Sequence, residues 1–151
     1  MKRILLFFAL GITLLVIWFG ESRKFFCLED GNCVTVWKTF FNVCYIIPGK
    51  YYGIVKPSEQ YIESSNTNLI TIYWSRELPN AFVFQSSGEV KAYDGSNHKF
   101  TFYDYTKDTS RLNKILYGPN AVKRADIKTD AGLMDIDIRE NYATDKSGKK
   151  L

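Results

Sequence analysis

A run of sixteen uncharged residues near the N-terminus, Ile4 to Phe19, constrains the fold of this chain more than any other feature. As a helix it would be about 24 Å long at ~1.5 Å per residue, a little less than the roughly 30 Å of a hydrocarbon core. The basic side chains of Lys2 and Arg3 can extend to the interface and cover the difference. The sequence therefore predicts a signal-anchor or transmembrane segment over residues 1–22 that contacts the membrane through residues 4–20.

Two other interpretations of this run stay open. Gly20 to Ser22 offers a small-x-small cleavage site, so the run can also be a signal peptide that is removed. It can also be a buried core helix. A three-residue tail before an apolar run is the layout of an export signal. The predicted location is therefore a single-pass membrane protein with its C-terminal domain extracytoplasmic, or a secreted domain if the leader is cleaved.

The remaining residues, about 130 of 151, are enough for one domain with one core. A hydrophobic content of 46% excludes a disordered chain, and an aromatic content of 16% is typical of sheets. From Glu21 onward, 18 Lys and Arg are interspersed with 16 Asp and Glu. This pattern argues against a nucleic-acid partner, which requires clustered positive charge. We expect a β-rich extracytoplasmic domain over residues 23–141 and a flexible tail over residues 142–151.

The segment "CLEDGNC" predicts a disulfide between Cys27 and Cys33. If Glu29 to Gly31 forms a three-residue hairpin loop with Gly31 in a left-handed conformation, the two cysteines lie directly opposite each other. In a non-hydrogen-bonded pair their Cα atoms would be about 4.5 Å apart, which a disulfide can bridge. An exported domain also favours oxidation. Cys44 is then left as a free, buried small hydrophobe.

Other uses of the cysteines stay open. Either Cys27 or Cys33 could pair with Cys44 instead. A zinc site made of the three cysteines and His98 would lack the short C-x2–4-C spacing that is typical of such sites. The acidic residues between positions 126 and 140 lack the calcium-loop pattern. The sequence therefore predicts no metal and no cofactor.

Beyond the cysteines, the pattern predicts a mainly β fold, with α+β as an alternative: one small antiparallel, sheet-rich domain with one short helix. The helix is expected from Asp108 or Thr109 to Tyr117, and residues 56–68 are expected to form a polar loop. The expected strands, in chain order, are "VTVW", "NVCYII", "YYGIV", "LITIYW", "AFVFQ", "EVKAY", "KFTFYDY" and "GLMDIDIREN".

The four strands between Leu69 and Tyr105 are expected to form an antiparallel meander. A second three-residue loop, Ser86 to Gly88, places Phe84 opposite Val90 and gathers the phenylalanines on one buried face. The opposite face is then rich in tyrosine, which suits recognition because it combines a rigid apolar ring with a polar tip. This face predicts a binding surface, or alternatively a second packed layer. Its four tyrosines are Tyr73, Tyr93, Tyr103 and Tyr105.

No catalytic motif is present in the sequence, which contains no G-x-S-x-G, P-loop or G-x-G-x-x-G and a single histidine, His98. We therefore expect no catalytic residues. The predicted function is a membrane-anchored extracytoplasmic interaction or binding module for a protein, a peptide or an envelope polymer. Two alternatives stay open: a small extracytoplasmic hydrolase that uses carboxylates or His98, and a structural subunit of an envelope complex.

Overall fold

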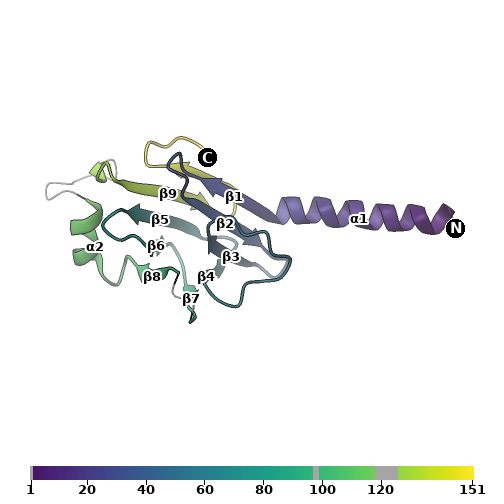
Figure 1. Ribbon diagram of the computed structural model, residues 1–151, viewed down its shortest axis with the longest axis horizontal. Coiled ribbons are helices and arrows are strands. Elements are labelled where there is room, and N and C mark those ends of the chain that lie inside the picture. Colours follow the sequence, from purple (N-terminus) through teal and green to yellow (C-terminus); the bar gives the residue numbers. More distant parts are fainter. Residues whose placement is uncertain (1, 97–98, 118–125) are drawn as a thin grey trace.

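The computed structural model describes residues 2–96, 99–117 and 126–151. Two five-stranded sheets lie face to face, with helix α1 (Lys2–Ser22) projecting from one end and helix α2 (Thr109–Leu116) at the other (Figure 1). The first sheet is ordered β1 (Arg23–Cys27), β2 (Cys33–Lys38), β3 (Val43–Pro48), β4 (Tyr61–Ser65) and β7 (Val90–Tyr93). The second is ordered β10 (Tyr142–Asp145), β9 (Ala131–Asp137), β5 (Leu69–Ser75), β6 (Ala81–Ser86) and β8 (Thr101–Asp104). The mainly β prediction is confirmed, and α2 is the predicted short helix.

The main core lies between the two sheets, where alternate residues of each strand point inward. Along β5, Ile70 and Ile72 are buried in this core, whereas Thr71 between them points outward. Cys44 is also in the core and is free, as predicted; its burial raises the pKa of the thiol to about 12. The other buried residues of the core include Phe26, Val34, Val36, Ile46, Ile62, Phe82, Phe84, Met134, Ile136 and Ala143.

Helix α2 covers the outer face of the second sheet. Its buried residues, Leu112 and Leu116, are four apart and so lie on one side of the helix. They pack against Tyr73, Val83 and Leu133, which point outward from β5, β6 and β9. Helix α2 therefore covers the part of the outer face that carries Tyr73, whereas Leu69, on the same face of β5, is 53% exposed.

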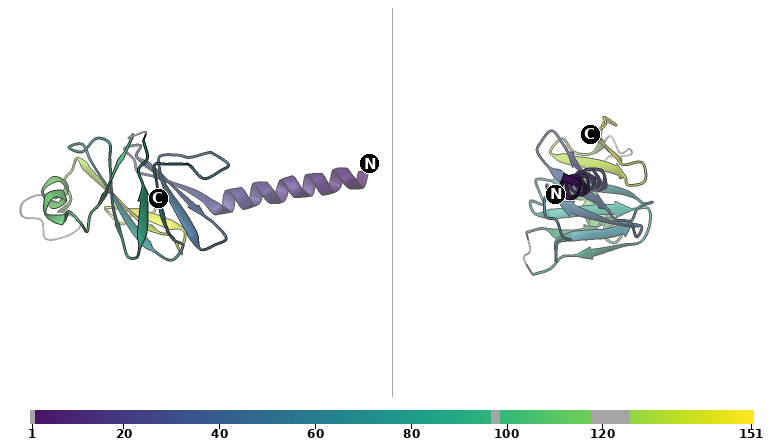
Figure 2. Two further views of the ribbon diagram at one scale, coloured as in Figure 1. Left: turned by 90° about the horizontal axis from the view of Figure 1, so that it is seen from below. Right: turned by 90° about the vertical axis from the view of Figure 1, so that its right-hand side faces the viewer.

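Helix α1 contacts little of the domain. The large apolar side chains described in its segment 4–16 are each more than half exposed, and the helix points away from both sheets in Figure 1 and in the left view of Figure 2. Among the residues that the structure describes, no helix has both the length and the apolar character needed to cross a membrane.

The predicted meander is wrong after its first hairpin. Strands β5 and β6 pair antiparallel as expected, but β7 pairs with β4 in the first sheet and β8 then pairs with β6 in parallel. The two glycines explain the difference. Gly31 has a positive φ of 89°, whereas Gly88 does not, so residues 86–88 do not form the predicted tight loop. A Cβ at Gly88 would lie 2.5 Å from Oδ1 of Asn68, so a larger residue at this position would require the Asn68 side chain to move.

Three other boundaries differ from the predictions. Residues 51–55 are not a strand, and β4 lies inside the predicted polar loop. The predicted flexible tail instead contains β10, and the Leu151 N–H donates to the carbonyl of Ala143 at 2.9 Å. Strand β4 has few apolar residues, so its hydrophobic pattern does not identify it as a strand. It lies between β3 and β7 and hydrogen-bonds to both. Pairing with neighbouring strands and the burial of Tyr61, Ile62 and Ala143 hold β4 and β10 in place.

Candidate functional site: a cleft at the end opposite α1

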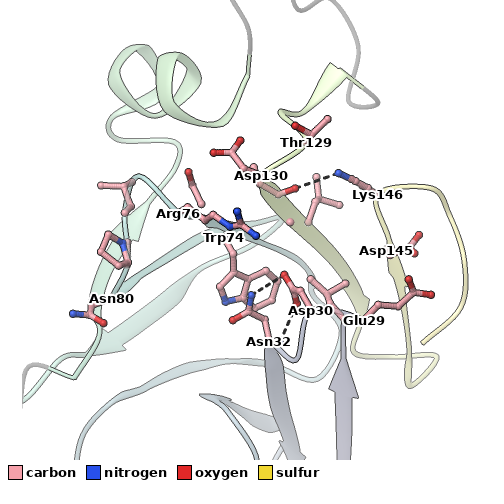
Figure 3. A pocket seen from close by; sticks show the side chains of 18 of the residues that line it. Glu29, Asp30, Asn32, Trp74, Arg76, Asn80, Thr129, Asp130, Asp145 and Lys146 are labelled. Carbon is pink, nitrogen blue, oxygen red and sulfur yellow. Dashed lines mark hydrogen bonds between the residues drawn. The ribbon is translucent and has the colours of Figure 1, made fainter.

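A cleft of about 700 Å³ opens at one end of the sandwich. This end is opposite the one from which α1 projects. Its walls come from four segments that are distant in sequence (Figure 3). They are the β1–β2 loop, the β5–β6 loop, the start of β9 and the end of β10, and Phe100, just before β8, also contributes to the lining. Strand β1 therefore begins at Arg23 beside α1 and ends at Cys27 beside the cleft.

The disulfide holds one wall of this cleft. Cys27 and Cys33 are bonded, as predicted, and their Cα atoms lie 4.1 Å apart. Within the loop, the Leu28 N–H donates to the Asn32 carbonyl at 2.9 Å. The Asp30 carboxylate accepts the Asn32 backbone N–H at 3.0 Å and the Asn32 side-chain amide at 2.9 Å. The acidic loop is thus closed by a covalent bond and by its own hydrogen bonds, so its shape is set before any ligand arrives.

Trp74, at the end of β5, lies at the centre of the cleft (Figure 3). The ring is half-buried and packs edge-on against Phe82, with centroids 6.3 Å apart. Across from it, a Cβ on Gly132 would lie 3.1 Å from Cδ1 of Leu28 and 3.8 Å from the Trp74 ring. The glycine therefore lets the β1–β2 loop approach the tryptophan closely. The partly exposed indole offers a flat apolar surface to a ligand.

The charge of the cleft differs from that of the whole chain. Around Trp74 lie four carboxylates and two cations, and one of the carboxylates, Glu29, is paired at 2.6 Å with Lys149, which is not among the lining residues. The whole chain, in contrast, has a formal net charge of +4. One cation, Lys146, donates to the Ala131 carbonyl at 3.3 Å. Hydrogen bonds from Ser147 hold the pKa of Asp145 below its ordinary value, so this carboxylate stays ionised. The cleft is locally acidic, and its carboxylates are Glu29, Asp30, Asp130 and Asp145.

No family model, curated protein or solved structure matches this chain. The chemistry of the cleft therefore rests on its own residues. Neither histidine nor cysteine is among the residues that line it. Within the described ranges, no group of three or more His, Cys, Asp or Glu could hold a metal ion. His98, the one histidine, lies outside the described residues. The lining offers carboxylates, amides, two cations and an aromatic ring, which together are suited to binding.

The four predicted binding tyrosines do not share a face. Tyr73 is 4% exposed beneath α2 and stacks on Tyr105, with centroids 5.1 Å apart. Tyr103 is half-buried in the same layer. Tyr93 lies instead in the first sheet and stacks on Tyr61 at 4.5 Å. The predicted single surface is therefore wrong, because β7 crosses to the other sheet and α2 covers the face that remains.

The sequence pattern does not predict the cleft, because Trp74 belongs to an alternating strand and its ring lies where β5 reaches the end of the sandwich. One available signal pointed to the site. A loop that is closed by two cysteines and carries two adjacent acidic residues, Glu29 and Asp30, is expected to be exposed and rigid. The partners of this loop, on β9 and β10, are more than a hundred residues away, and no local pattern links them to it.

A second cluster, at the α1 end, anchors the long loop that follows β3. The Arg23 guanidinium lies 3.9 Å above the Trp37 ring. Its Nη1 donates to the carbonyls of Tyr51 at 3.2 Å and Gly53 at 2.7 Å. The Tyr51 ring in turn stacks on Trp37. The first residue after α1 thus holds residues 51–53 on the outer face of the first sheet.

Replacing Arg23 with lysine is expected to release this loop. An ammonium keeps the charge but cannot stack on Trp37 and reach both carbonyls at once, so we expect a loss of about 1–2 kcal/mol. Limited proteolysis should then cut within residues 51–55 faster than in the parent chain. The control is Lys24→Arg on the adjacent, opposite-facing position of β1. Equal cleavage rates in Arg23→Lys and the parent chain would show that Arg23 does not hold the loop.

Proposed function

We propose that this protein is a membrane-attached, extracytoplasmic binding module whose cleft receives a cationic segment of a partner protein. The observation that carries the proposal is the position of the cleft. A rigid, acidic, tryptophan-centred cleft opens at the end of the domain opposite α1, where a partner can approach without hindrance from the surface that holds the helix.

Membrane attachment is supported by the properties of α1. The side chains described along residues 4–16 are all uncharged, and the large apolar ones are exposed around the helix. In the sequence the uncharged run continues to Phe19. Such a surface is costly in water, at roughly 25 cal/mol per Å² of apolar area. Insertion into lipid would remove that cost. The Cys27–Cys33 disulfide supports the extracytoplasmic side, because such bonds persist in oxidising compartments.

A cationic ligand is supported by the balance of charge and by Trp74. The carboxylates outnumber the cations in the cleft, so a lysine or arginine side chain would gain from long-range attraction. The exposed part of the Trp74 ring can also accept such a cation over its face. Since the wall that carries Glu29 and Asp30 is closed by the disulfide, little ordering would be needed on binding.

Site-specific photo-crosslinking of the full chain tests the proposal. A photoreactive residue at Asn80, on the rim of the cleft, should capture a discrete partner protein, whereas one at Leu69, an exposed position of β5 outside the cleft lining, should not. Vesicle flotation of the same samples reports membrane attachment separately. Capture at both positions, or at neither, would contradict the assignment of the cleft.

Two charge variants of exposed cleft residues then test the chemistry. For a cationic partner, Asp130→Asn should weaken capture at Asn80 a few-fold, in line with about 0.5–1 kcal/mol for a single exposed charge. Arg76→Gln, at another exposed cleft position, should leave capture unchanged or strengthen it. Both effects should shrink as the salt concentration rises. Weaker capture in Arg76→Gln with no change in Asp130→Asn would identify an anionic ligand instead.

A further inference from the structure

Two loops of the first sheet carry the most exposed apolar side chains of the domain, and both flank the point where α1 joins β1. We propose that these loops, residues 39–42 and 51–55, are seated in the interfacial region of the lipid bilayer, so that the domain lies against the membrane. This inference rests on the proposed membrane attachment. It adds a second contact, made by the domain itself, which holds the cleft in a defined direction away from the bilayer.

Strand register places the first loop beside the helix. Arg23, the first residue after α1, pairs with Trp37, and the loop begins two residues later at Thr39. Hydrogen bonds fix the conformation of this loop. The Thr39 N–H donates to the Val43 carbonyl at 2.8 Å, and the Thr39 carbonyl accepts the Asn66 side-chain amide at 3.2 Å. Its exposed side chains are therefore presented by a defined turn.

The second loop is held to the same end by Arg23, through the hydrogen bonds to Tyr51 and Gly53 described above. The Tyr51 hydroxyl donates to the carbonyl of Val55 at 2.8 Å and so closes the tip of the loop. Blue loops of the first sheet extend on the side from which α1 leaves (Figure 2). The two tips therefore flank the junction with the helix.

The exposure of these side chains is exceptional within the domain. Phe41 is 87% exposed, Ile54 82%, Phe40 79%, Val55 69% and Tyr52 67%. Among the described residues outside α1, these are the five most exposed large hydrophobic residues. Soluble surfaces rarely gather such side chains in one place unless the patch contacts something.

The position of the two loops next to α1 identifies lipid as the partner that they contact. A helix with exposed apolar side chains leaves the domain between these tips, so lipid that surrounds the helix would also meet the loops. Apolar groups at this depth insert roughly 5–10 Å into the boundary between headgroups and acyl chains, and tyrosine is favoured there. Lys24 and Lys38 lie close to the junction in sequence and register, where anionic headgroups would attract them.

A labelling experiment on the full chain in vesicles tests this contact. Phe41→Cys is coupled to an environment-sensitive fluorophore, and the matched control is Asn80→Cys at the cleft end. The native cysteines should not interfere, because Cys27 and Cys33 are bonded and Cys44 is buried with a raised thiol pKa. Vesicles contain phosphatidylcholine and phosphatidylglycerol, with or without lipids brominated near the headgroup. The label at position 41 should emit at shorter wavelength and be quenched by brominated lipid, whereas the label at position 80 should do neither.

Each outcome decides a separate point. Flotation of the labelled chain with vesicles reports the α1 attachment. If the chain floats but position 41 emits like position 80 and escapes quenching, the loops do not touch lipid and the inference fails while membrane attachment stands. If position 41 is shielded from water but insensitive to brominated lipid, protein covers the loops and lipid is the wrong occupant. A chain that does not float overturns both the attachment and the inference.

Discussion

Replacing Phe82 with alanine is expected to destabilise the domain by about 3–5 kcal/mol, the usual range for removal of a large buried ring. Phe82 is fully buried between the two sheets and makes edge-on contacts with Trp74, Phe100 and Phe102. The cavity left by the ring would remove packing contacts both within the core and with Trp74 in the cleft. Urea unfolding of the detergent-solubilised chain, followed by circular dichroism, measures the loss.

The chain offers a matched control for this change. Phe41→Ala removes the same atoms from a side chain that is 87% exposed, so we expect a change within about 0.5 kcal/mol in detergent. Phe82→Leu, which fills most of the volume, should fall between the two. Equal losses in Phe82→Ala and Phe41→Ala would contradict the arrangement of the core between two facing sheets.

Removing the disulfide by the double change Cys27→Ser and Cys33→Ser is expected to cost about 2 kcal/mol, because the bond closes a short loop and limits the unfolded chain. The change should also loosen the wall of the cleft formed by residues 28–32, since only hydrogen bonds would then close the loop. Partner capture by a photoreactive residue at Asn80 should weaken along with stability. Urea unfolding and capture yield are the two measurements.

A reductant separates the bond from the substitutions. Reduction should lower the stability of the parent chain by the same amount and leave the double variant unchanged, because Cys44 forms no disulfide. Hydrogen exchange should rise in the β1–β2 loop after either treatment. If reduction left the parent chain as stable as before, the bond would not contribute to the folded state in solution.

The β1–β2 hairpin shows what could be predicted from sequence. Its register follows from the loop between Cys27 and Cys33 and from the freedom of Gly31 to adopt a positive φ. The two paired residues are six positions apart, so the hairpin needs no information from the rest of the chain. The same holds for α2, whose buried leucines are four residues apart, and for the alternation of Met134 and Ile136 in β9.

The crossing of β7 shows what could not be predicted. Residues 86–88 resemble residues 29–31, since each set ends in glycine, yet only Gly31 is left-handed. Gly88 lies next to Asn68, twenty residues earlier, whose side-chain amide donates to the Glu89 carbonyl at 3.4 Å. Strand β7 then pairs with β4, which the sequence pattern presents as a polar loop. The pairing of a strand depends on its neighbour in the sheet, and the sequence pattern does not identify β4 as a strand.

By itself, the sequence determined the local features: the uncharged N-terminal run, the disulfide-closed acidic loop, the short helix and the alternation of most strands. Each depends on residues within one or two turns or within one hairpin, where steric and hydrogen-bonding preferences act directly. Only the tertiary structure decided that Tyr73 would be covered while Trp74 would line a cleft. Likewise, only the fold brought Asp130 to the disulfide loop and Phe41 to the end of the domain beside α1. These placements depend on which strands become neighbours, and that is set by pairing and packing across the whole chain.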